Sequence, residues 1–160
     1  MTQPPAFIPG LELSRRFYHE AVRPLLDAHY PGLPHAAALI GDGSEVLGLD
    51  TPMSRDHGWG PRLLLFLTRA DWQAHHAAIH AMLARELPPR FLGYSTHFTP
   101  PDPQDHGTQL LQAPPPGEPI NHRVELHTLA TYCGELLGSD PAAPLTAADW
   151  LTLPQQKLLA

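Results

Sequence analysis

The spacing of apolar residues predicts a helix near the start of the chain. In residues 11–30 these residues recur every three or four positions, which is the period of an amphipathic α-helix, at Leu13, Phe17, Val22, Leu25, Leu26 and Tyr30. Pro24 lies inside this pattern and has no amide hydrogen to donate, so we expect a kink or a split into two helices there. Pro31 and Gly32 then end the segment.

Two short apolar runs predict strands. Residues 36–40 form the first run, and residues 63–67 form a second that is too short for a helix and is therefore expected to be a buried central strand. Between them, residues 41–44 are glycine-rich and predict a tight turn. A short helix is expected over residues 44–48 and a loop over residues 49–62.

Polar and apolar positions in the second half predict two helices and two more strands. Residues 71–87 are alanine-rich, and Asp71 lies near their start, where the helix dipole favours a negative charge. Aromatic residues and threonine favour a strand over residues 91–98, and a proline-rich loop follows over residues 99–120. Residues 123–128 alternate, which predicts a strand with Glu125 and His127 on one face. A helix over residues 129–137 is expected to end at Gly138.

The order of these elements indicates an α/β (α+β) fold, with a small mixed β-sheet flanked by helices. We expect one domain over residues 1–145. Residues 146–160 are expected to be the start of a helical segment that stops early, because residues 146–149 resemble a helix capping box. This segment is also where we expect a dimer contact or a partner chain.

Composition narrows the class of protein. The 160 residues fit a single domain, and 20 prolines predict long, stiff loops. The net charge is −6 and the basic residues are scattered, so binding to duplex nucleic acid is not expected. Cys133 is the only cysteine, which precludes an internal disulfide and fits a reducing compartment. With no signal-like N-terminus and no long apolar run, we expect a cytoplasmic protein without a membrane span.

The stretch from residue 39 to residue 67 contains the most informative motif. Gly43 and Ser44 are followed by Gly48, and Ser54 and Asp56 then precede the second strand. This pattern resembles the signature of the DNA polymerase beta-like nucleotidyltransferase superfamily. More closely, the chain is similar to a bacterial nucleotidyltransferase-like family known as domain of unknown function 4037. The similar segments are residues 7–11 (FIPGL), 50–54 (DTPMS), 59–62 (WGPR), 93–96 (GYST), 122–125 (HRVE) and 149–151 (DWL).

The resemblance implies transfer of a nucleoside monophosphate from an NTP, with ATP expected, to a small-molecule, RNA or protein acceptor. Such transfer uses Mg²⁺ ions held by carboxylates on neighbouring strands. By the resemblance, Gly43 and Ser44 form the phosphate-binding turn. Asp56 and Glu125 are the catalytic, metal-holding carboxylates. Arg62 is expected either to contact phosphate or to form a structural salt bridge.

One position departs from the family pattern. The family has a second carboxylate where this chain has Gly58, which supplies no ligand. Asp42, Asp50, Asp105 and His57 are the candidates to replace it. The alternative is a catalytically degenerate module that binds nucleotide or a protein partner.

Overall fold

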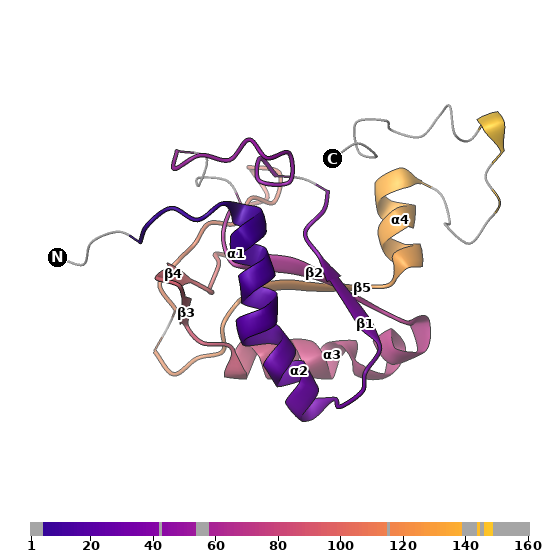
Figure 1. Cartoon of the computed structure of the whole chain (residues 1–160), viewed down its shortest axis with the longest axis horizontal. Coiled ribbons are helices and arrows are strands. Elements are labelled where there is room, and N and C mark those ends of the chain that lie inside the picture. Colours follow the sequence, from indigo (N-terminus) through magenta and orange to yellow (C-terminus); the bar gives the residue numbers. More distant parts are fainter. Residues whose placement is uncertain are drawn as a thin grey trace.

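A mixed sheet of three strands forms the centre of the protein (Figure 1). The computed structural model describes residues 5–41, 43–53, 58–114, 116–138, 144 and 146–148. The strand order is β1-β2-β5, with bounds His35–Ala38, Arg62–Leu67 and Arg123–His127. The central strand β2 pairs antiparallel with β1 and parallel with β5. The predicted small mixed sheet flanked by helices is therefore confirmed.

The N-terminal helical segment is divided in three. Helix α1 covers Gly10–Phe17, a π-helical turn covers Tyr18–Val22, and α2 covers Arg23–His29. Pro24 lies in the first turn of α2, where its missing amide hydrogen is tolerated. Its ring would crowd the carbonyl group of residue 20 in a regular α-helix, and the wider π turn lies at that point. The interruption predicted at Pro24 is thus confirmed, one turn upstream of the proline.

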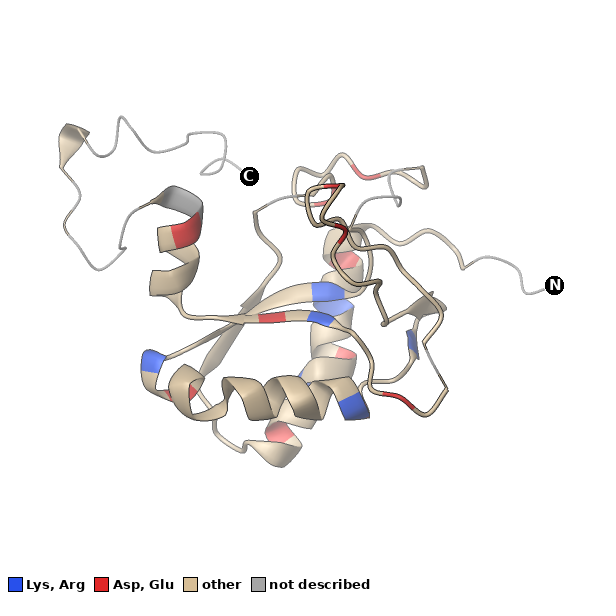
Figure 2. Cartoon of the chain, turned by 180° about the vertical axis from the view of Figure 1, so that it is seen from behind, with Lys and Arg blue, Asp and Glu red and all other residues tan. Residues whose placement is uncertain are grey.

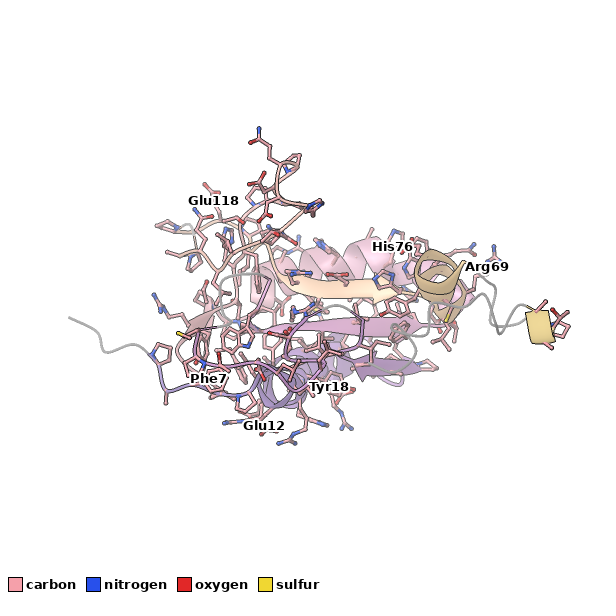
Figure 3. The ribbon with its side chains drawn as sticks, turned by 90° about the horizontal axis from the view of Figure 1, so that it is seen from above. Phe7, Glu12, Tyr18, Arg69, His76 and Glu118 are labelled. Carbon is pink, nitrogen blue, oxygen red and sulfur yellow. The ribbon has the colours of Figure 1, made fainter. Side chains whose placement is uncertain are left out.

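The two faces of the sheet differ in character. On one face, Leu63, Leu65 and Val124 are buried in a core built with residues of α1, α2 and α3 (Arg69–Glu86). Viewed from above, the labelled Tyr18 lies toward the β1 edge of the sheet and the labelled His76 toward the β5 edge (Figure 3). The alternate positions of the strands form the second face. Its facing pairs on β2 and β5 are Arg62 with Arg123, Leu64 with Glu125, and Phe66 with His127. We call these six residues the polar face.

Two predicted elements are wrong. Residues 91–98 do not form one strand, because Leu92 and Gly93 both have positive φ (49° and 88°) and turn the chain into a hairpin of β3 (Arg90–Phe91) and β4 (Tyr94–Ser95). Residues 44–48 form consecutive turns rather than a helix. Gly48 donates its amide to the carbonyl of Glu45 and then leaves helical geometry at a φ of +68°.

The other expected elements agree with the structure to within a few residues. Helix α3 begins at Arg69, two residues earlier than predicted, with the Thr68 side chain accepting the amide of Asp71. Helix α4 (Leu129–Leu137) ends at Gly138 in the left-handed conformation, as predicted. The helix and domain boundary expected near residue 146 lie largely outside the described residues. None of the helices in the described part of the chain has both the length and the apolar character needed to cross a bilayer.

Candidate functional site

Chain connectivity brings most of the predicted site residues to one end of the polar face. Because β1 runs antiparallel to β2, the glycine turn that follows β1 comes back to the start of β2, beside Arg62. Because β2 and β5 are parallel, Arg62 pairs with Arg123, and Glu125 lies two residues further along β5. Basic and acidic segments lie close together where these strands begin (Figure 2). Asp56 lies outside the described residues.

Arg62 forms a salt bridge within the protein. Its Nε donates to Glu45 Oε1 at 2.9 Å, and its Nη2 donates a second, short hydrogen bond to the same oxygen. Both side chains are largely buried, with 12% of Arg62 and 3% of Glu45 exposed. Of the two roles expected for Arg62, the structure therefore supports the salt bridge.

The same ion pair explains the glycine at position 43. A Cβ atom there would lie 2.5 Å from Arg62 Nη2 and 2.6 Å from Glu45 Oε2, so no side chain fits. We call the space at the Cβ position of Gly43 the notch. By the resemblance, a phosphate would bind there, but the carboxylate of Glu45 fills this space. Sequence reasoning missed Glu45, because a single acid in a turn gives no periodic signal. Ser44 contributes to the turn through its backbone, because its carbonyl accepts a hydrogen bond from the amide of Leu49.

Glu125 lies between two basic side chains on β5. Arg123 Nη2 donates to Glu125 Oε1 at 3.1 Å, and His127 Nε2 lies 3.5 Å from Glu125 Oε2. His127 and Arg123 together lower the pKa of the Glu125 carboxyl to about 2, against the opposing effect of its partial burial. Glu125 is thus a carboxylate whose negative charge is already balanced by its neighbours.

Gly58 faces the guanidinium of Arg123. Arg123 Nη1 donates to the Gly58 carbonyl at 3.3 Å, and a Cβ atom at position 58 would lie 3.0 Å from the same nitrogen. The φ of Gly58 is +64°, a conformation that disfavours other residues. A cationic side chain therefore occupies the place toward which the expected second carboxylate would project.

The described candidates to replace that carboxylate have other roles. Asp50 Oδ2 accepts the backbone amide of Gly10 at 2.6 Å and the indole of Trp59 at 3.3 Å, which fixes the loop against the start of α1. Asp105 lies in an exposed turn, where its backbone bonds to Asp102 and Thr108. Asp42 and His57 lie outside the described residues.

The donor groups of the described residues do not fit a pair of divalent cations. No group of three or more His, Cys, Asp or Glu side chains able to hold a metal occurs among the described residues. Two-metal sites need several carboxylate oxygens around the ions. Here, Glu125 is bound to Arg123 and Glu45 to Arg62.

Comparison with protein-family models, curated proteins and solved structures finds no match to this chain. The resemblance to nucleotidyltransferases therefore stays a prediction based on the segments quoted for it.

Introducing the carboxylate that the resemblance predicts at position 58 is not expected to create a metal site. We predict that Gly58→Asp lowers the free energy of unfolding by about 1 kcal/mol, because of its positive φ. The new carboxylate should pair with Arg123 rather than with Mg²⁺. Gly48→Asp is the matched control, since Gly48 has a φ of +68° and nothing within 4 Å of its Cβ position.

Denaturant unfolding of both variants with and without Mg²⁺ measures the effect. We expect no stabilisation by Mg²⁺ in either. A Mg²⁺-dependent gain in stability for Gly58→Asp, but not for Gly48→Asp, would show that a metal site is restored and that this prediction is wrong.

Proposed function

We propose that this protein is a catalytically degenerate nucleotidyltransferase-like module, which has lost nucleotidyl transfer and serves as an interaction module. The observation that carries the proposal is the carboxylate of Glu45 in the notch above Gly43, paired there with Arg62. In the expected enzyme, this notch and this arginine would receive nucleotide phosphate.

The charge balance supports this proposal. A phosphate entering the notch would have to displace Glu45 from Arg62 and leave a buried carboxylate without its cation, which costs several kcal/mol. Nucleotidyl transfer also needs cations that stabilise the developing charge on the phosphate. The two arginines at this end of the sheet are each paired with an internal glutamate. A resemblance in fold does not by itself bring activity, because activity depends on the site.

The test compares the native chain with Glu45→Gln, which keeps the shape of the side chain and removes its charge. Binding of tripolyphosphate and of Mg-ATP is measured by calorimetry, and transfer of labelled nucleotide from ATP is measured with Mg²⁺. Glu12→Gln is the control, because Glu12 forms an exposed ion pair with Arg15 on α1.

We expect no transfer by the native chain and a Kd for tripolyphosphate above about 1 mM, close to the limit of useful binding. Glu45→Gln should bind tripolyphosphate about tenfold more tightly, because a phosphate can then approach Arg62 without displacing a carboxylate, while Glu12→Gln should match the native chain. Mg²⁺-dependent transfer by the native chain would contradict the proposal, as would equal affinity of Glu45→Gln and native protein.

A further inference from the structure

The guanidinium of Arg123 is held from three sides. Nη2 binds Glu125 Oε1, Nη1 binds the carbonyl of Gly58, and the group lies over the ring of Phe98, 5.8 Å from the centroid. The side chain is mostly buried, at 18% exposed. These contacts come from β5, from the segment before β2 and from the loop after β4, so they fix the charge at one point of the polar face.

That point lies where a divalent cation would bind Glu125. A metal ion coordinates a carboxylate oxygen at roughly 2.0–2.6 Å. The guanidinium nitrogen already lies 3.1 Å from Glu125 Oε1, so a metal ion at this oxygen would lie beside a second positive charge that already balances the carboxylate. The second family carboxylate is also absent, because position 58 is a glycine whose Cβ direction points at Arg123.

We propose that Arg123 is a built-in replacement for a divalent cation, which balances the charge of Glu125 and keeps the polar face free of metal. The inference rests on the proposed function, because it assumes that Glu125 would hold a metal ion in an active nucleotidyltransferase. It also predicts a latent site: without Arg123, Glu125 and His127 remain as a carboxylate and an imidazole that point at one another. His127 Nε2 is buried, lies 3.5 Å from Glu125 Oε2 and forms no closer hydrogen bond among the described residues, so the two side chains could hold one ion between them. Mn²⁺ accepts both kinds of ligand.

The experiment measures Mn²⁺ binding to the full chain by water-proton relaxation and by broadening of the Glu125 and His127 NMR signals. The variants are Arg123→Ala, Arg123→Gln and the double variant Arg123→Ala with Glu125→Gln. Arg90→Ala is the control, because Arg90 is an exposed arginine whose side chain bonds a backbone carbonyl. Arg123→Gln keeps a polar side chain over Phe98, in case the alanine variant does not fold.

We expect the native chain and Arg90→Ala to show no saturable Mn²⁺ binding at millimolar concentrations. Removing Arg123 should strengthen Mn²⁺ binding at least tenfold, and adding Glu125→Gln should abolish the gain. Mn²⁺ binding at Glu125 in the native chain would overturn the proposal, and so would the absence of any gain in both Arg123 variants. These outcomes are independent of nucleotide transfer, which tests the proposed function separately.

Discussion

Replacing Glu45 with alanine is expected to destabilise the protein by about 3 kcal/mol, since it removes one partner of a buried ion pair. Glu45 is 3% exposed and Arg62 is 12% exposed, so water can compensate little of the loss. The substitution also removes packing at the start of α1, where the Cβ position of Gly10 lies 2.6 Å from Glu45 Cβ. The glycine turn, α1 and β2 meet at this side chain.

Denaturant unfolding of three variants measures the effect. Glu20→Ala is the control for the loss of an ion pair, because Glu20 pairs with Arg16 on an exposed helix surface, where solvent screens the pair and its loss should cost little. The double variant Glu45→Ala with Arg62→Met should be more stable than Glu45→Ala alone, because replacing both members of a buried ion pair by apolar side chains costs less than removing one of them. If Glu45→Ala costs no more than Glu20→Ala, the pair does not anchor the turn.

Local signals were enough to predict most of the fold. The alternation over residues 123–128 and the apolar run of residues 63–67 each give their strand directly, because side chains of a strand alternate between its faces. Pro24 and Gly138 likewise marked a helix interruption and a helix end. The hairpin within residues 90–95 was missed because the aromatic residues favour a strand, while the turn depends on Leu92 adopting a φ of 49°. Leucine carries no sequence signal for that conformation.

The candidate site was predictable only in part, because its geometry depends on pairing between distant strands. The resemblance singled out Glu125 and the alternating pattern placed it on one face of its strand, but the role of Arg123 was not predicted, although Arg123 lies two residues away on the same face. The role of Arg123 follows from the register of β5 on β2 and from its hydrogen bond to the carbonyl of Gly58. These two residues lie 65 positions apart in the sequence, so no local pattern links them. The pairing of Glu45 with Arg62 arises in the same way, through the return of the chain after β1.

Acidification from pH 7 to pH 4 is expected to lower the free energy of unfolding by about 3 kcal/mol through His122 alone. His122 is 5% exposed at the start of β5. Its Nδ1 accepts the amide of Val124 at 3.1 Å, and its Nε2 donates to the carbonyl of His80 on α3 at 3.1 Å. This arrangement requires a neutral ring with the proton on Nε2, since a proton on Nδ1 would remove the acceptor of the Val124 amide.

The sign follows from the two pKa values of His122. Burial lowers its pKa in the folded protein from 6.5 to about 4, against the opposing effect of the bond to His80. Between these values the unfolded chain binds a proton that the folded chain does not, so stability is fully present above pH 6.5 and falls as the pH approaches 4. The expected loss is about 2 kcal/mol at pH 5 and about 3 kcal/mol at pH 4.

Comparison with His122→Asn isolates this contribution from the other groups that titrate in acid. Asparagine keeps an acceptor for the Val124 amide but does not titrate, so the variant should be less stable than the native chain at pH 7 and should lose less stability on acidification. The exposed His80 ring lies against His122 from α3, with ring centroids 4.4 Å apart, and it remains in both proteins. Urea unfolding at pH 7, 5 and 4 gives the two pH profiles. Parallel profiles would mean that His122 takes up its proton in the folded protein as readily as in the unfolded chain, and that burial does not hold it neutral.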